Sequence, residues 1–70
     1  MYIRNKILYD NNGDACAIGD RVKIVCDDGK IFTDTITMIT DEQEVGFEDN
    51  EIYLKNNYVV LYNISEVYKI

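Results

Sequence analysis

The chain contains no histidine, no proline and no tryptophan among its 70 residues, and it has a single serine, Ser65. Histidine is the usual general acid or base near neutral pH, and it activates most serine nucleophiles. The adjacent carboxylates at residues 27–28 and 48–49 lie in segments of turn composition, where solvent rather than a cleft is expected to surround them. The sequence therefore predicts a protein without enzymatic activity.

Metal-binding patterns are also lacking. The two cysteines, Cys16 and Cys26, are too few for a zinc site in a chain without histidine. Asp10, Asn12 and Asp14 have the spacing of a calcium loop, but the glycine and glutamate required at its sixth and twelfth positions are missing. We therefore expect no metal and no cofactor, and we interpret this segment as a turn rich in Asx residues.

No apolar run approaches the roughly 20 residues that a membrane-spanning helix needs. The N-terminus also lacks the apolar stretch of a secretory signal. We therefore expect one small domain over residues 1–70, located in the cytoplasm, where both cysteines are reduced thiols. The abundant isoleucine, asparagine, lysine and tyrosine have AT-rich codons, which indicates an AT-rich bacterium or one of its phages or mobile elements.

Positive charge is scarce, with 7 basic residues against 13 acidic ones and a net charge of −6. The whole excess lies in residues 34–70, which hold eight acidic and two basic residues. Nucleic-acid binding depends on lysine and arginine at phosphates, so this balance disfavours a nucleic-acid partner. A protein with a basic surface is the expected partner.

Apolar and polar residues alternate along much of the chain. Residues 21–40 alternate on both sides of Asp28-Gly29, which predicts a β-hairpin with a tight turn. The second strand of this hairpin, at residues 30–40, is unusually long. Phe32, Ile36 and Met38 share one face of it, whereas the following isoleucine joins the threonine face. This change of face predicts a strongly bent strand, as in a small closed barrel.

Shorter strands are predicted at both ends of the chain, and turns separate them. The strands are expected at residues 2–9, 45–47, 51–54, 58–62 and 67–70, with turns at residues 10–14, 55–57 and 63–66. We therefore expect an all-β fold, a small antiparallel SH3-like barrel of five to seven short strands.

Two segments resemble the Sm-like family of SH3-like barrels. The first contains a strand, an Asp-Gly turn and the long strand KIFTDTITMI, and the second, LYNISEV, resembles the last motif of the family. In that motif a short turn carries an apolar residue, here Ile64, just before the final strand. The resemblance implies the Sm-like form of the barrel.

The sequence departs from the family at its functional positions. Asp34 stands where the long strand commonly has glycine, and Tyr62-Asn63 replaces the basic pair of the RNA-binding branches. The resemblance thus implies the fold without the RNA site. The family also includes an acidic barrel that inhibits the transcription terminator Rho by covering its RNA-binding surface, which is a precedent for binding a protein.

We expect the chain to act as a regulatory or inhibitory protein-binding module through an acidic face at residues 41–51 and its neighbouring tyrosines, which are rigid and common at interfaces. The candidate residues are Glu44, Glu48, Asp49, Glu51, Tyr53 and Tyr58. One alternative is a Sm-like RNA-binding oligomer that uses Arg4, Lys6, Arg21 and Lys23. A second alternative is an assembly or accessory subunit that pairs with a neighbour through an edge strand.

Overall fold

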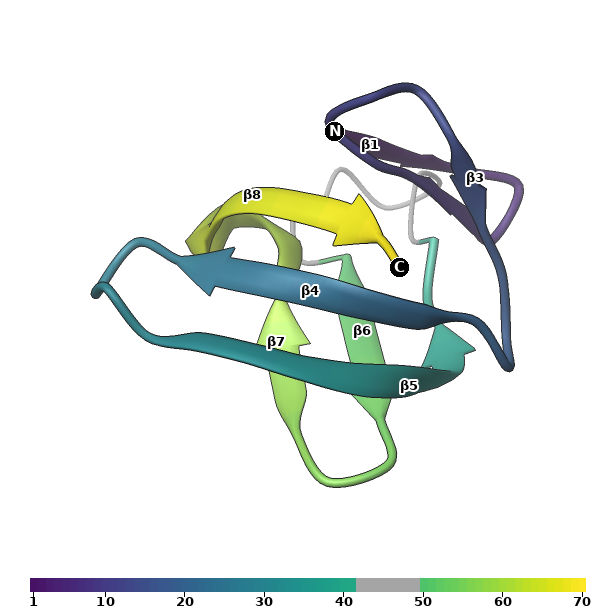
Figure 1. The fold of residues 1–70 in the computed structure, drawn as a ribbon. Helices are drawn as coiled ribbons and strands as arrows, with labels where there is room; N and C mark the ends of the chain where they lie inside the picture. The colour runs from purple at the N-terminus through teal and green to yellow at the C-terminus, as the bar shows by residue number, and fades with distance from the viewer. Residues whose placement is uncertain (42–49) are drawn as a thin grey trace.

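The computed structural model describes residues 1–41 and 50–70, in which β-strands are joined by turns and one short 3₁₀ helix (Figure 1). All strand pairs are antiparallel, so the predicted all-β class is confirmed. The elements in chain order are β1 (Tyr2–Arg4), β2 (Ile7–Tyr9), β3 (Ala15–Cys16), β4 (Arg21–Cys26), β5 (Ile31–Ile39), β6 (Glu51–Leu54), β7 (Tyr58–Val60), the 3₁₀ helix η2 (Leu61–Asn63) and β8 (Ile64–Lys69). The strand predicted at residues 45–47 lies outside the described residues.

The N-terminal segment forms a hairpin, so the prediction of one strand over residues 2–9 is wrong. Asn5 and Lys6 separate β1 from β2 and have φ angles of 52° and 61°. A two-residue type I′ turn requires positive φ at both central positions, and asparagine adopts such angles more readily than most residues. Asn5 is therefore the sequence signal for this turn. β3 pairs with β2 and completes a three-stranded sheet in the order β1-β2-β3.

The Asp28-Gly29 turn joins β4 to β5 as predicted. Gly29 has a φ of 91°, and the Cys26 N–H donates to the Lys30 carbonyl at 2.8 Å to close the hairpin. One carboxylate oxygen of Asp28 accepts the Lys30 N–H at 2.9 Å. The aspartate therefore stabilises the turn through its side chain, as Asx residues often do.

β5 bends where its pairing with β6 slips by one residue, between Ile36 and Met38. Such a bulge reverses the alternation of inward and outward side chains. Ile39 is consequently buried, whereas Met38 is 45% exposed. The bend confirms the prediction made from the change of face, but the expectation that Met38 lies inward with Phe32 is wrong.

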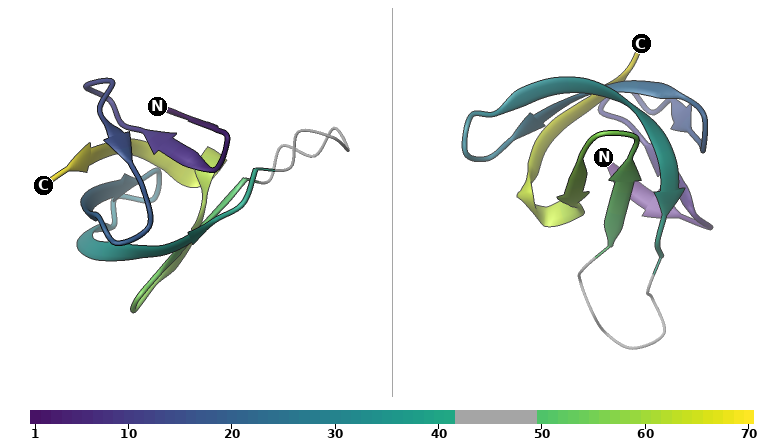
Figure 2. Two further views of the ribbon diagram at one scale, coloured as in Figure 1. Left: turned by 90° about the vertical axis from the view of Figure 1, so that its right-hand side faces the viewer. Right: turned by 90° about the horizontal axis from the view of Figure 1, so that it is seen from below.

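The five-stranded sheet has the strand order β7-β6-β5-β4-β8 and curves strongly along β5 (Figure 2, right). β7 and β8 are its two end strands, and η2 connects them. Among the described strands, these two are not paired with each other, so the curved sheet is barrel-like rather than fully closed.

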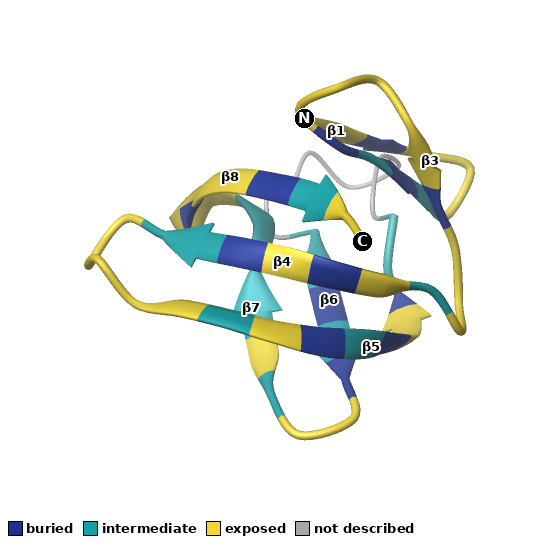
Figure 3. Ribbon diagram, viewed as in Figure 1, coloured by how far each residue is buried: buried dark blue, intermediate teal, exposed yellow. Residues whose placement is uncertain are grey.

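Both sheets contribute to one hydrophobic core. Along β4, buried and exposed residues alternate, which Figure 3 shows as alternating bands. The buried apolar residues are Ile3, Leu8, Cys16, Val22, Ile24, Ile36, Ile39, Ile52, Leu54, Ile64 and Val67. Isoleucine and valine dominate this set, as expected for side chains that pack on pleated strands.

The end of the chain differs in its boundaries from the sequence prediction. β7 ends at Val60, η2 takes the next three residues, and β8 begins at Ile64 rather than at residue 67. The Leu61 N–H donates to the Asn50 carbonyl at 2.8 Å, and the Ile64 N–H donates to the Leu61 carbonyl. The continuous apolar run at residues 58–62 hid this turn, since periodicity does not mark a boundary inside such a run.

Asp34 is buried on β5, at 3% exposure. Its carboxylate accepts the backbone N–H of Asn56 at 2.9 Å and the side-chain amide of Asn57 at 2.7 Å. It also accepts the backbone N–H of Thr35 at 2.7 Å. The carboxylate therefore ties the β6–β7 turn to the middle of the sheet.

Asp10 is the second buried carboxylate, and it joins the two sheets. It accepts the N–H groups of Asn12 and Asp14 within its own turn, and that of Lys69 on β8 at 2.8 Å. Beside it, the Asn11 side chain accepts the Val67 N–H at 2.7 Å, and the Asn11 N–H donates to the Val67 carbonyl. The turn at residues 10–14 thus covers the outer edge of β8.

Candidate functional site

Two tyrosines, a carboxylate and a methionine gather on the outer face of β5, β6 and β7. Ile52 and Leu54 point into the core, so the alternate residues of β6, Glu51 and Tyr53, point outward. Strand register places Tyr58 and Met38 opposite Tyr53, one on each side. We call these four outward residues, Met38, Glu51, Tyr53 and Tyr58, the Tyr–Glu patch.

Hydrogen bonds fix the geometry of the Tyr–Glu patch. The hydroxyls of Tyr53 and Tyr58 both donate to Oε2 of Glu51, at 2.5 Å and 2.9 Å. The two rings pack in a tilted arrangement with their centroids 5.0 Å apart. The hydrogen bond from Tyr53, followed by that from Tyr58, lowers the pKa of Glu51 below its ordinary value. The patch therefore presents a carboxylate held at the hydroxyl ends of two packed aromatic rings.

The structure brings together three of the six residues predicted for protein binding, Glu51, Tyr53 and Tyr58. Met38 was missed because the sequence prediction placed it on the same face as Phe32 and Ile36, whereas the bulge before it turns it outward. The other three predicted residues, Glu44, Glu48 and Asp49, lie outside the described residues.

The basic residues of the alternative RNA-binding prediction fall on different sheets. Arg4 ends β1 and Lys6 lies in the β1–β2 turn, whereas Arg21 and Lys23 occupy the outward positions of β4. The Arg21 guanidinium donates to the hydroxyls of two threonines on β5, each at 3.4 Å. Each pair is local, and the fold does not assemble the four residues on one strand surface.

A groove of about 500 Å³ lies between β7 and the β4–β5 hairpin. Its apolar lining comes from Cys26, Phe32 and Val59, which are partly buried against the core. Its charged lining comes from the hairpin, with Asp27 and Asp28 on one side and Lys30 nearby. Sequence reasoning missed this groove because it depends on the curvature that brings β7 near the hairpin.

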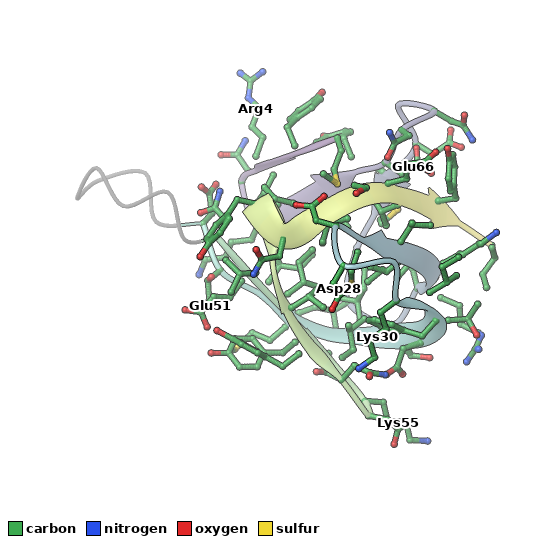
Figure 4. The ribbon with its side chains drawn as sticks, turned by 90° about the vertical axis from the view of Figure 1, so that its left-hand side faces the viewer. Arg4, Asp28, Lys30, Glu51, Lys55 and Glu66 are labelled. Carbon is green, nitrogen blue, oxygen red and sulfur yellow. The ribbon has the colours of Figure 1, made fainter. Side chains whose placement is uncertain are left out.

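The groove and the Tyr–Glu patch are adjacent surfaces that share Tyr58. Figure 4 shows Asp28 and Lys30 beside β7, while Glu51 lies on the other side of the β6–β7 hairpin. Lys55 marks the tip of that hairpin, and Arg4 lies at the far end of the molecule. The β6–β7 hairpin therefore separates Glu51 from Asp28 and Lys30.

Cys16 and Cys26 are both free thiols, and burial raises the pKa of Cys16 to about 11. Within residues 1–41 and 50–70, histidine, cysteine and carboxylate side chains form no group of three that would hold a metal ion. Nor does that part of the chain include a helix with the length and apolar character needed to cross a membrane.

No model of a protein family matches this chain, no curated protein matches it significantly, and no solved structure shows a significant match to its fold.

Proposed function

We propose that the chain is a non-enzymatic protein-binding module, regulatory or inhibitory in role, and that the Tyr–Glu patch is its contact surface. The observation that carries the proposal is the shared acceptor, since Oε2 of Glu51 receives both tyrosine hydroxyls. A fixed pair of aromatic rings loses little side-chain entropy on binding, which makes tyrosine an effective interface residue.

The expected partner carries an arginine or lysine at the centre of its contact surface. A guanidinium group stacks on aromatic rings and pairs with carboxylates, and Glu51 supplies the carboxylate between Tyr53 and Tyr58. Met38, which is 45% exposed beside Tyr53, adds an adaptable apolar contact. The net charge of −6 would speed the approach of a basic partner, and salt would weaken it.

Variants of the Tyr–Glu patch are expected to lose the partner. Glu51→Gln removes the charge, and Tyr53→Ala removes one ring; a residue at the centre of an interface is worth about 2 kcal/mol, or roughly 30-fold in affinity. The measurement is affinity capture from the source cells with quantitative mass spectrometry, at low and at high salt. We expect at least one protein that the wild-type chain captures at low salt but that neither variant captures. The wild-type chain should also lose this protein at high salt.

The chain provides a matched control on β8, where the Tyr68 hydroxyl donates to Glu66 in a second Tyr–Glu pair. Glu66→Gln and Tyr68→Ala should retain the captured partner. If the variants of the Tyr–Glu patch captured as much of the partner as the β8 variants do, the proposal would be contradicted. A filter-binding titration with RNA at low salt is run in parallel, and RNA binding by the wild-type chain would favour the RNA-binding alternative instead.

A further inference from the structure

β7 is an end strand of the five-stranded sheet. Its pairing with β6 shows which of its backbone N–H and carbonyl groups point away from the sheet. The N–H of Leu54 donates to Asn57, and the N–H of Leu61 donates to Asn50, so these are hydrogen-bonded pairs of the β6–β7 ladder. Antiparallel ladders alternate bonded and non-bonded pairs. The pair Glu51–Val60 is therefore non-bonded, and the N–H and carbonyl of Val60 point away from β6.

The other end of the sheet is already covered. The outward N–H groups of Val67 and Lys69 on β8 donate to Asn11 and Asp10, and the Val67 carbonyl accepts the Asn11 N–H. A second copy of the chain therefore cannot pair with β8 without displacing its own N-terminal turn. This asymmetry favours a foreign strand at β7 over self-association through β8.

The groove beside β7 provides room and chemistry for such a strand. Phe32 and Val59 offer an apolar floor, and Asp27 and Asp28 line the groove at the β4–β5 turn. One oxygen of the Asp27 carboxylate accepts the Ser65 hydroxyl, and one oxygen of Asp28 accepts the Lys30 N–H. The ammonium of Lys30 lies over the Phe32 ring, 5.8 Å from its centroid. With two carboxylates and one ammonium, the lining is acidic overall, which suits a cationic ligand.

We propose that this groove binds an extended, basic peptide segment that adds to β7 as an antiparallel or parallel strand. Its backbone pairs with the outward groups of Val60, an apolar side chain rests on Phe32, and an arginine or lysine lies near Asp27 and Asp28. Strand addition gains affinity from main-chain hydrogen bonds and specificity from alternate side chains. The site adjoins the Tyr–Glu patch at Tyr58, but the residues that would hold the peptide, Val60, Phe32, Asp27 and Asp28, lie outside the patch.

The test uses a short synthetic peptide in which valine alternates with arginine, titrated by fluorescence anisotropy into the full chain. Two control peptides carry glutamate in place of arginine, or N-methyl groups on the backbone edge that would pair. The parent peptide should bind about tenfold more tightly than either control, or more. A tenfold ratio of dissociation constants corresponds to about 1.4 kcal/mol of binding free energy. No binding, or equal binding of all three peptides, would overturn the proposal.

Val60→Pro removes the outward N–H while leaving the β6 ladder intact, which proline tolerates on an edge strand. We expect it to abolish peptide binding, whereas Val60→Ala should retain most of it. The double variant Asp27→Asn, Asp28→Asn should weaken binding about tenfold or more, because it removes the cation site. Undiminished binding by either the proline variant or the double asparagine variant would refute the strand-addition geometry.

Three further measurements distinguish the possible explanations of the result. If Val60→Pro fails to fold by circular dichroism, the N-methyl control alone decides whether backbone pairing occurs. If Glu51→Gln abolishes peptide binding while the groove variants do not, the peptide occupies the Tyr–Glu patch, and the groove proposal fails while the proposed function stands. Self-association of the wild-type chain at high concentration, measured by light scattering and abolished by Val60→Pro, would identify a second copy as the occupant and also overturn the proposal.

Discussion

Replacing Ile24 by alanine is expected to lower the free energy of unfolding by about 2–5 kcal/mol, the usual range for truncating a buried isoleucine. Ile24 is fully buried in the interior strand β4, between β5 and β8. The total stability of a domain this small is on the order of 4–10 kcal/mol, so the variant should be close to unfolding at room temperature. Urea denaturation followed by circular dichroism measures the change.

Ile31→Ala is the matched control, because Ile31 lies in the neighbouring strand β5 and is 60% exposed. It should change stability by less than about 0.5 kcal/mol. Similar losses for both isoleucines would mean that the core is not where the structure places it.

Replacing Asp34 by asparagine is expected to cause the second large loss of stability. It should also make the free energy of unfolding depend less on pH in the acid range. Burial opposes ionisation of Asp34, but hydrogen bonds from Asn57, Thr35 and Asn56 together hold its pKa below the ordinary value of 3.8. A carboxyl whose pKa is lower in the folded state stabilises the fold above the unfolded pKa, and this contribution is lost as the pH falls through the folded pKa. Asp34→Asn should therefore destabilise the chain at neutral pH and show a smaller further loss below pH 3.8.

Urea midpoints at neutral pH and at successively lower pH values test this expectation. Asp28→Asn is the control, because Asp28 is an exposed turn residue. Its carboxylate accepts the Lys30 N–H, and the amide oxygen of asparagine can accept the same hydrogen bond. Asp10 and Glu51 also have lowered pKa values, so some acid sensitivity remains in every variant. An acid profile for Asp34→Asn that is as steep as that of the wild type would contradict the role assigned to Asp34.

The sequence was most informative where structure is local. Asp28-Gly29 predicted its hairpin because glycine meets a backbone requirement that few other residues can meet. The bend of β5 was also predicted, since Ile39 departs from the alternation that Phe32 and Ile36 begin. Asn5 carried the signal for the missed β1–β2 turn, but it stands within an alternating segment that equally fits one strand.

What remained hidden depends on contacts between distant segments. Nothing near Asp34 in the sequence shows that Asn56 and Asn57 will supply its hydrogen bonds, nor does the turn around Asp10 reveal that it will meet Lys69. In the candidate site, composition and interface preference pointed to Glu51 and the tyrosines. Their common hydrogen-bond acceptor, and the groove beside β7, emerge only from strand register and curvature.

The cover that Asp10 and Asn11 place over β8 has a consequence for stoichiometry. A sheet with two open ends can add chain after chain, because head-to-tail contacts that do not close produce filaments. Of the two end strands of the five-stranded sheet, only β7 keeps its outer edge uncovered by the N-terminal turn. Each chain therefore offers one edge for the strand addition proposed above, and we expect the complex with a single peptide segment to be one-to-one.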